Sequence, residues 1–389
     1  MTGGEICSQP MERLRTTHTG SLPRPGDLAS MLTAHDRNEA VPELETRVRA
    51  AVTEVVRQQA DTGIDVLNDG EMGKIGYSTY VKERLTGFGG ESQWASRRRL
   101  ELEDHPDWAE RWAARLDRGA ITAPACTGDV RLADPDAVLR DITVLKDAAD
   151  ASGVAHDRLF MSAASPGVIA HFFGNEHYPT REAFLGALAD AMRDEYEAIA
   201  AAGITLQVDC PDLAMSRHSV FAELTVEEFR REASLSVDAL NHAVARIPAE
   251  RMRLHLCWGN YEGPHDHDVA LRDIVDVVLR AKPAGISIES CNPRHGHEWQ
   301  VWEHVSLPDD RYLVPGVIDS TNNYVEHPEL VAQRLLNFAR AVGPERVVGG
   351  SDCGFGTFAT TATVVPTVTW SKLRSLVDGA RLASEALRA

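Results

Sequence analysis

Two side chains with metal-binding chemistry stand two positions apart in the stretch RLHLCWGN, residues 253–260. His255 and Cys257 follow an apolar alternation typical of a strand, and the pattern breaks at Gly259. Because successive side chains of a strand point to opposite faces, residues two apart share a face. The imidazole and the thiol are therefore predicted to point together at the end of a strand. Two half-buried core residues are the alternative interpretation, since cysteine is among the most buried residue types.

Two further zinc-competent side chains occur at matching intervals. Glu289 follows Cys257 by 32 residues at the end of the run GISIES, and Cys353 lies 64 residues beyond Glu289, after RVVGGSD. These intervals correspond to one and two strand–helix units of about 30 residues in a barrel. Thiolate, imidazole and carboxylate together favour zinc. The pattern predicts a zinc site formed by His255, Cys257, Glu289 and Cys353 at one rim.

Cys291 is a competing ligand, because it lies two residues after Glu289 in the same strand phase and could replace Glu289 or Cys353. Cys353 is preferred because it stands at the end of its own strand. A purely structural zinc site is another interpretation, but such sites favour compact sets of cysteines and histidines. Ligands that are spread along the chain and include a carboxylate favour catalysis.

A zinc site of this composition favours the alkylation of a thiol. Two thiolates and one carboxylate give the zinc centre a net charge of about −1. A substrate thiolate that replaces Glu289 leaves this charge unchanged, so the sulfur keeps electron density and can attack carbon. Zinc enzymes that activate water more often use three histidines, or two histidines and a glutamate.

Composition narrows the classes of partner. The chain has 389 residues, 43% of them hydrophobic, and a formal charge of −18, which argues against nucleic acid and anionic membranes and leaves small molecules as expected partners. It contains no apolar run long enough to cross a membrane, and its first residues lack the apolar stretch of a secretory signal. Six sparse cysteines give no disulfide framework. We therefore expect a cytoplasmic protein.

Short apolar runs alternate with amphipathic helical patterns, which predicts a parallel sheet with helices outside. No GxGxxG motif follows the first run, so a doubly wound fold is disfavoured. We expect an α/β fold with a single (β/α)8 TIM barrel over residues 13–389, after a flexible N-terminus at 1–12. The run 120–128 is an expected ninth, extra run because Pro124 interrupts it. The eight expected strands lie within residues 16–21, 64–71, 158–167, 204–211, 253–260, 285–290, 312–320 and 346–354.

A charged insertion is expected after the second strand, at about residues 88–118. Trp108 and Trp112 stand one helical turn apart within it. A helical insertion pinned by these two aromatic residues is the prediction, and a lid or an oligomer contact is the alternative.

The motifs TTHTGSLPRP, NDGE, VDCP, RLHLCWGN and SDCGFGT resemble the catalytic barrel of cobalamin-independent methionine synthases and the related epoxyalkane:coenzyme M transferases. Both families belong to a superfamily with uroporphyrinogen decarboxylase. The resemblance implies the zinc ligands named above. It also implies an amino-acid-thiol pocket in which Ser21 binds a carboxylate and Glu71 and Asp209 bind an ammonium group. Without the resemblance, these two acids could equally cap nearby helices.

The sequence departs from the methionine synthase pattern. Those proteins carry a second, N-terminal barrel that helps to hold a polyglutamylated folate, and this chain has about half their length. Their Asp-Glu-Pro is Asp209-Cys210-Pro211 here, and Thr321 aligns with a histidine thought to donate a proton. The nitrogen of a methyl-folate must be protonated to leave easily, so the missing acid weakens the folate interpretation.

Replacement acids are available in two loops, HDHD (265–268) and NPRHGHEW (292–299). The candidate catalytic residues are therefore His295, His297 and Asp209, and Arg294 is a candidate for an anionic substrate group. Polar loops with capping histidines are the alternative interpretation.

Zinc-dependent methylation of homocysteine or a similar thiol, by 5-methyltetrahydrofolate or another donor, is the leading functional hypothesis. Addition of a thiol such as coenzyme M to an epoxide is the second, although Glu71 and Asp209 favour a thiol that carries an ammonium group. The third hypothesis is a metal-free lyase resembling uroporphyrinogen decarboxylase. Such an enzyme would need a basic pocket, and the acidic residues at the strand ends argue against it. The fourth hypothesis is a binding protein that zinc stabilises and that has no catalytic activity.

Overall fold

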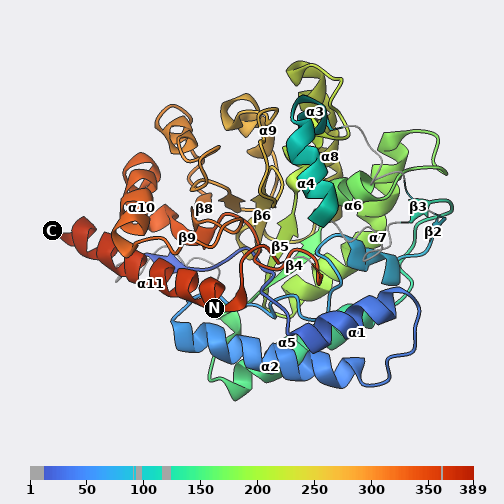
Figure 1. Cartoon of the computed structure of the whole chain (residues 1–389), viewed down its shortest axis with the longest axis horizontal. Coiled ribbons are helices and arrows are strands. Elements are labelled where there is room, and N and C mark those ends of the chain that lie inside the picture. The colour runs from blue at the N-terminus through green and yellow to red at the C-terminus, as the bar shows by residue number, and fades with distance from the viewer. Residues whose placement is uncertain (1–12, 91, 93–98, 116–123, 361) are drawn as a thin grey trace.

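Seven parallel strands form the main sheet of the computed structural model, which describes residues 13–90, 92, 99–115, 124–360 and 362–389. The order is β1-β9-β8-β7-β6-β5-β4, and the sheet curls with helices around its outside (Figure 1). The expected flexible segment 1–12 lies outside the described residues. The strands are β1 (Arg15–Thr16), β4 (Phe160–Ala164), β5 (Thr205–Asp209), β6 (Met252–Leu256), β7 (Gly285–Ile288), β8 (Tyr312–Ile318) and β9 (Val348–Ser351).

Helices follow most strands, and several of them have identifiable capping residues. Thr225 and Glu228 form a capping box at the start of α8, and Gly63 ends α2 in the left-handed conformation, with φ 92°. The helices around the sheet are α1 (Gly26–Asp36), α2 (Leu44–Thr62), α5 (Ala137–Ala151), α6 (Pro166–Phe172), α7 (Arg181–Ala201), α8 (Val226–Ala243), α9 (Val275–Val278), α10 (Pro328–Val342) and α11 (Pro366–Arg388).

The segment 64–71, expected to be the second strand, runs between the two edges of the sheet without forming a regular strand. Leu67 makes a single parallel bridge with Leu159, next to β4, and the Val66 N–H donates to the Thr16 carbonyl of β1 (3.0 Å). Directly after these contacts the chain bends into turns in which side-chain oxygens accept backbone N–H groups. The α/β class and the parallel sheet are confirmed, and the regular sheet has seven strands where eight were expected.

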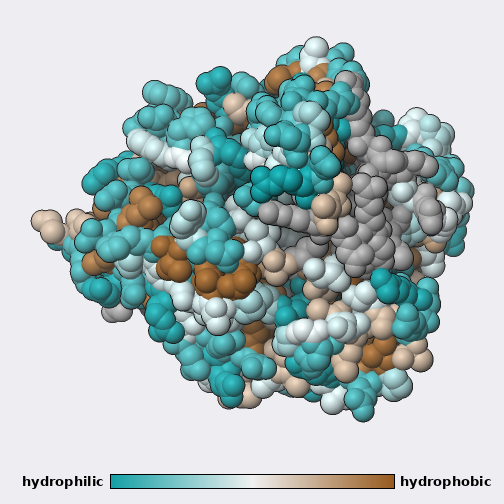
Figure 2. Space-filling view, in the orientation of Figure 1, coloured by the Kyte–Doolittle hydropathy of each residue, from teal (hydrophilic) through white to brown (hydrophobic). Residues whose placement is uncertain are grey.

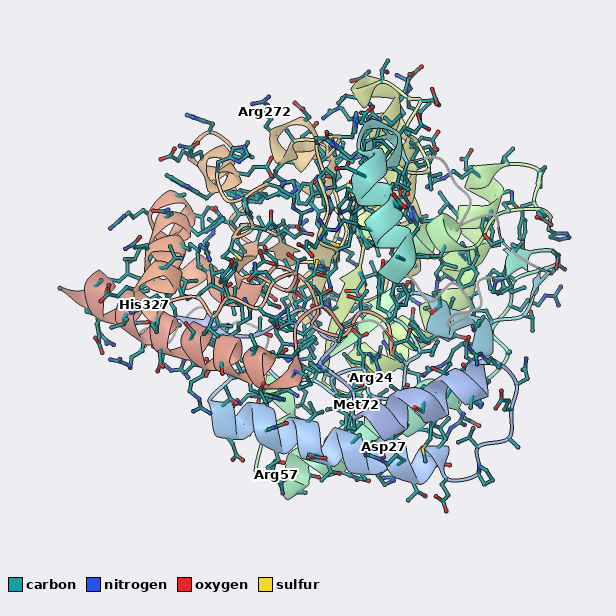
Figure 3. The ribbon with its side chains drawn as sticks, viewed as in Figure 1. Arg24, Asp27, Arg57, Met72, Arg272 and His327 are labelled. Atoms are coloured by element: carbon teal, nitrogen blue, oxygen red, sulfur yellow. The ribbon has the colours of Figure 1, made fainter. Side chains whose placement is uncertain are left out.

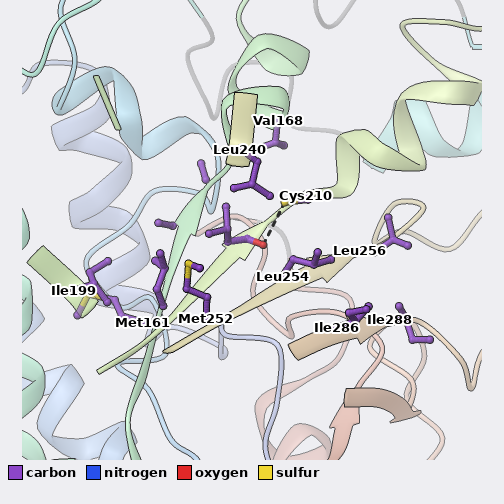
Figure 4. Close-up of a cluster of buried hydrophobic side chains, with 14 of the residues drawn as sticks. Met161, Val168, Ile199, Cys210, Leu240, Met252, Leu254, Leu256, Ile286 and Ile288 are labelled. Carbon is purple, nitrogen blue, oxygen red and sulfur yellow. Dashed lines mark hydrogen bonds between the residues drawn. The ribbon is translucent and has the colours of Figure 1, made fainter. Parts of the chain in front are cut away.

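Alternation along β6 separates an apolar outer face from a polar inner face. Leu254 lies in an apolar cluster that also contains Ile199 of α7 and Leu240 of α8 (Figure 4). Arg253 and His255, on the other face, point to the inside of the curled sheet, where both are buried. The strand therefore holds its functional face against the interior by burying the opposite face under helices.

Arg253 links the strands across that interior. Its guanidinium donates to the Gln207 side chain of β5 (2.7 Å), to the Thr17 hydroxyl (3.1 Å) and to the His18 carbonyl (2.9 Å), and it lies 3.8 Å from the ring centroid of Phe160 in β4. Because Thr17 and His18 follow β1, one side chain connects both edges of the sheet.

The insertion after residue 88 contains the helices α3 (Leu100–Asp104) and α4 (Pro106–Arg115), between the strands β2 (Phe88–Gly89) and β3 (Ala125–Cys126) of a separate antiparallel pair. In the described part of the run 120–128, residues 124–128, the strand is β3, and it belongs to this antiparallel pair and not to the main sheet. Trp108 stacks on Trp112 with ring centroids 5.2 Å apart, and Trp112 stacks on Tyr261 in the loop after β6 (5.4 Å). These contacts pin the helical insertion beside the end of β6.

The exposed surface is mainly hydrophilic on the face shown in Figure 2, where apolar residues form small separate patches. None of the described helices has the length and apolar content that a membrane crossing requires.

The interior contacts of Arg253 generate a stability prediction. Arg253→Met should lower the free energy of unfolding by about 3–5 kcal/mol, because it leaves buried acceptors unpaired. Arg57 points outward from α2 and is exposed, so Arg57→Met is the matched control (Figure 3). Urea denaturation followed by circular dichroism measures both. An Arg253 variant as stable as the control would show that this side chain does not join the sheet edges.

Candidate functional site

Three potential metal-ligand atoms converge inside the ends of β6 and β9. One donor atom each from His255, Cys257 and Cys353 lies within 4.8 Å of the others, and all three residues are buried. The His255 Nε2 atom is 3.6 Å from the Cys353 sulfur. We call these three residues the donor cluster. The strand alternation in β6 and the curl of the sheet together place them side by side.

Glu289 stands at the edge of the donor cluster, directly after β7. Its Oε1 atom accepts a hydrogen bond from the Cys353 thiol (3.3 Å) and another from the Trp258 backbone N–H (3.1 Å). Its Oε2 atom accepts from the side chains of Asn292 (2.9 Å) and Arg294 (2.8 Å). The structure therefore brings all four predicted ligands together, with the carboxylate held by partners on both oxygens.

The chemistry of these groups fits a divalent cation such as zinc. Burial, and then the charge of Arg253, lower the pKa of His255 to about 3, so its imidazole is neutral and can act as a ligand. Burial, and then Cys257 and Glu289, raise the pKa of the Cys353 thiol. A cation beside these groups would favour the thiolate that this environment otherwise disfavours. The Ser287 hydroxyl, 3.1 Å from His255 Nδ1, leaves Nε2 directed at Cys353.

Cys291, the competing ligand, lies apart from the donor cluster. Its backbone N–H donates to Asp352 (3.0 Å), and its carbonyl accepts from Arg334 (3.1 Å). Burial, and then Asp352, raise the pKa of its thiol. Cys126 and Cys210 are also buried elsewhere, Cys210 in the apolar cluster of Figure 4.

Asp352 orders the turn that carries Glu289, a role that the sequence did not indicate. Its carboxylate accepts the backbone N–H groups of Ser290 (2.8 Å), Cys291 (3.0 Å) and Asn292 (3.0 Å). Burial, and then the negative charge of Glu289, raise its pKa to about 7. The residue before Cys353 thus fixes the position of the turn that follows β7.

The predicted ammonium site is built around Glu71, whose backbone has the left-handed conformation (φ 56°) that is costly for a residue with a side chain. Glu71 is 2% exposed; its Oε1 accepts from the Ser162 hydroxyl (2.7 Å), and its Oε2 has no hydrogen-bond partner among the described residues. Gly20 permits this approach, since a Cβ there would lie 2.7 Å from Glu71 Oε1. A buried carboxylate oxygen without a partner is suited to a cationic ligand.

Asp209 ends β5 close to the same space. Burial, and then the charge of Glu71, raise its pKa to about 8, while Lys74 acts in the opposite direction. Gln207 donates to Asp209 Oδ1 (2.8 Å), and Lys74 donates to the Ser162 carbonyl (2.6 Å). The sequence identified the two acids but not the buried Lys74 beside them.

Ser21 lies between Gly20, which approaches Glu71, and the loop that begins at Cys353. Its carbonyl accepts the Phe355 N–H (2.8 Å), and a Cβ at Gly354 would lie only 2.0 Å from its hydroxyl oxygen. Gly354 follows Cys353 directly, so glycine is required where the two segments touch. Ser21 therefore lies against the loop that begins with a donor-cluster cysteine.

The predicted acids His295 and His297 differ in their surroundings. His295 stacks on Trp258 with centroids 3.9 Å apart, and its ring nitrogens face Asp268 (3.1 Å) and Glu298 (2.8 Å). Burial lowers its pKa, but the hydrogen bonds to these two carboxylates prevail and raise it to about 9. His297 is exposed in the loop before residues 298–303. Their catalytic role stays a prediction.

Asp268 joins the loops after β5, β6 and β7. It lies 2.9 Å from His218 Nδ1, 3.1 Å from His265 Nδ1 and 3.1 Å from His295 Nε2, and its interactions with these histidines lower its pKa despite burial. The sequence pattern HDHD indicated a polar loop here, but not that its last acid would gather histidines from three loops.

Tyr77 is a further residue that the sequence did not indicate. Burial, and then the charges of Cys257 and Asp209, raise its pKa. Its backbone N–H donates to the Thr357 carbonyl (3.2 Å), in the loop after β9, and its ring lies against Phe358 (5.9 Å). Its hydroxyl has no hydrogen bond to the described residues. Negative charges from the donor cluster and from the acid at the end of β5 therefore both act on this phenol.

The insertion also contacts the loop after β6 through charged pairs. Tyr261 donates to Glu101 (2.5 Å), and two histidine–aspartate pairs join His105 to Asp266 (2.8 Å) and His267 to Asp104 (2.6 Å). The loop that begins at Cys257 is thereby attached to α3.

Comparison with known proteins identifies similar sequences over most of the chain. Residues 169–381 match the family model described as the catalytic domain of cobalamin-independent synthase. The methionine synthase of Sulfolobus acidocaldarius is 25% identical over 344 residues, covering 88% of this chain and 85% of that protein. The methionine synthase of Saccharolobus solfataricus is 24% identical over 382 residues and covers 96% of each chain.

Solved structures share the fold. A B12-independent methionine synthase from Shewanella sp. W3-18-1, in complex with selenomethionine, superposes with a TM-score of 0.71 at 20% identity, covering 97% of this chain and 99% of that one. A putative vitamin-B12 independent methionine synthase from Listeria monocytogenes gives a TM-score of 0.64 at 19% identity, with the same coverage.

The raised pKa of Asp209 predicts a pH-dependent loss of stability. The folded protein holds this proton up to about pH 8, whereas an unfolded aspartate loses it near pH 4, so the contribution to stability disappears as the pH rises between these values. Asp209→Asn cannot lose the proton. Its free energy of unfolding, measured in urea, should rise relative to the wild type as the pH rises through this window.

The exposed Asp378 in α11 gives the matched control, Asp378→Asn, which should follow the wild type at every pH. A constant difference between the Asp209 variant and the wild type across the window would contradict the assignment of a raised pKa.

Proposed function

The chain belongs to the family of cobalamin-independent synthase catalytic domains, and we propose that it transfers a methyl group to the sulfur of homocysteine or a similar amino-acid thiol. One observation carries the proposal: a buried carboxylate oxygen of Glu71 without a hydrogen-bond partner is linked to a cluster of two thiols and an imidazole through Gly20, which approaches Glu71, and Ser21, which contacts Gly354. A substrate with an ammonium group and a thiol would span the two. The similar methionine synthases support the same reaction.

We propose that the donor cluster and Glu289 hold a zinc ion. Bound zinc would favour the thiolate form of the substrate and keep it nucleophilic towards carbon. His255 is suited to the task as a neutral imidazole, and Cys257 and Cys353 lie close enough to share one cation. Glu289 also accepts hydrogen bonds from the Trp258 backbone and from the side chains of Asn292 and Arg294, so these groups could hold its carboxylate if it left the metal.

The remaining residues bind and orient the thiol. Glu71 and Asp209 would bind the ammonium group, which would replace the missing partner of Glu71 Oε2 and favour the ionised form of Asp209. Ser21 and the neighbouring backbone would bind the carboxylate. Because the pocket presents two acids to the amino end of the ligand, an ammonium-bearing thiol fits better than a sulfonate thiol such as coenzyme M.

A methyl donor that leaves as an amine, such as 5-methyltetrahydrofolate, needs a proton at nitrogen when the carbon–nitrogen bond breaks. Thr321 cannot provide a free acid, since its hydroxyl donates to Asp319 (2.7 Å). His295 and His297 remain candidates, and the Tyr77 hydroxyl is a third, because it has no hydrogen bond to the described residues and the charge of Cys257 acts on it. The donor itself is either this folate or a protein or small-molecule substitute.

We also propose that residues 64–68 act as the eighth strand of a closed barrel and that residues 13–389 form one domain. The hydrogen bonds of Leu67 and Val66 to the two sheet edges support the closure. The insertion at about 88–118 is then an addition to the barrel rather than a separate unit.

Metal content tests the proposed ligands. Cys353→Ser should lose most of the zinc and the methylation of homocysteine, because one thiolate ligand disappears. Cys291→Ser is the matched control and should keep both, since Cys291 lies apart from the donor cluster. Elemental analysis and a methylation assay measure these outcomes. Full zinc in the Cys353 variant, with loss in the Cys291 variant, would move the ligand to Cys291.

The ammonium site makes a separate prediction about substrate affinity. Glu71→Gln should raise the KM for homocysteine by about 10- to 100-fold, the loss expected for a hydrogen bond to a charged group. The KM for a thiol without an amino group, such as 3-mercaptopropionate, should change little. Equal effects on the two thiols would place the ammonium group elsewhere.

A further inference from the structure

The two oxygens of Glu289 have different kinds of partner. Oε1 lies on the side of the donor cluster, 3.3 Å from the Cys353 sulfur. Oε2 lies on the opposite side, between the Asn292 amide (2.9 Å) and the Arg294 guanidinium (2.8 Å). The side chain is 1% exposed, so water does not compensate its charge. The carboxylate therefore stands between the cluster and a ready-made anion site.

Arg294 is fixed in this anion site by its other contacts. Its Nε donates to the Asn292 side-chain oxygen (3.1 Å), and Nη1 lies 3.7 Å from Asp268 without a hydrogen bond. Asn292 is in turn held by Asp352, which accepts its side-chain N–H (2.8 Å). The guanidinium is only 16% exposed. Both the position and the charge of the anion site are thus provided before any substrate binds.

In the zinc-loaded protein both cysteines would be thiolates, so a substrate thiolate that joins the donor cluster adds a negative charge beside these two and Glu289. One of these anions must then withdraw, or the repulsion will oppose binding. Cys257 and Cys353 have no cationic side chain within hydrogen-bonding distance among the described residues, whereas Glu289 already contacts Arg294. The carboxylate is the group that can withdraw with its charge compensated.

We propose that Arg294 is a positioning residue that receives the Glu289 carboxylate when a substrate thiol takes its place at the metal. This inference rests on the proposed function, because it assumes a zinc ion and a thiol substrate. Arg294 then sets the affinity for the thiol without touching it. From the sequence, Arg294 was a candidate to bind an anionic group of the substrate. In this proposal it binds an anionic group of the protein, the Glu289 carboxylate.

The experiment compares Arg294→Gln with Arg294→Lys in the zinc-loaded protein. Isothermal titration with homocysteine should give a Kd at least about 10-fold higher for the Gln variant, the loss expected for a buried hydrogen bond to a charged group. The Lys variant keeps the charge and should recover most of the affinity. Zinc-edge absorption spectra at a homocysteine concentration that saturates the wild type should show an oxygen replaced by sulfur in the wild type, and the oxygen retained in the Gln variant.

Arg272→Gln is the matched control, because Arg272 is 77% exposed and lies at the periphery of the molecule (Figure 3). It should bind homocysteine like the wild type, and all the variants should contain equal zinc. A Gln variant with wild-type affinity and an oxygen replaced by sulfur would overturn the assignment, as would loss of its zinc, which would make Arg294 a support of the metal site.

The proposed function and the role of Arg294 are contradicted by different results. A wild-type protein that neither binds homocysteine nor methylates it would overturn the function, and this inference with it. A wild type that methylates homocysteine while its zinc keeps the oxygen would overturn only the exchange.

Discussion

Burial of several potential anions in one place is the physical constraint on which this site depends. His255, Cys257 and Cys353 lie together at the ends of β6 and β9, with Glu289 against them. In water such groups would separate, and in an interior they remain together only if hydrogen bonds or cations compensate them. A divalent cation is the simplest compensation for this donor set, and the proposed exchange of a substrate thiol for Glu289 would use the same imbalance of charge.

The fold satisfies this constraint with a scaffold of hydrogen bonds rather than with more apolar packing. Asp352 holds the turn after β7 by three backbone N–H groups, and Asn292 links it to Glu289. Arg253 spans the interior of the sheet below them. The strained backbone of Glu71 persists beside this site because Gly20 leaves room for its side chain and the Ser162 hydroxyl donates a hydrogen bond to its Oε1 atom. The proposed shift of the Glu289 carboxylate is small, so the residues around it must keep fixed positions.

Strand alternation and strand spacing made the donor residues predictable from sequence. The pairing of His255 with Cys257 follows from a period of two, and the intervals to Glu289 and Cys353 follow from the repeat of strand and helix. The eighth strand was less predictable, because side-chain turns at residues 68–71 compete with strand pairing directly after Leu67. Arg294, Asp352 and Tyr77 carry no periodic signal, since their roles arise from loops that meet only in three dimensions.

Cadmium-113 resonance of the metal-substituted protein tests the central claim most directly, because the chemical shift moves downfield with each thiolate that binds the metal. The account predicts one metal ion per chain and a downfield shift on addition of homocysteine, with no shift on addition of homoserine, which has a hydroxyl in place of the thiol. A protein that binds no metal, or a resonance that responds equally to both amino acids, would contradict it.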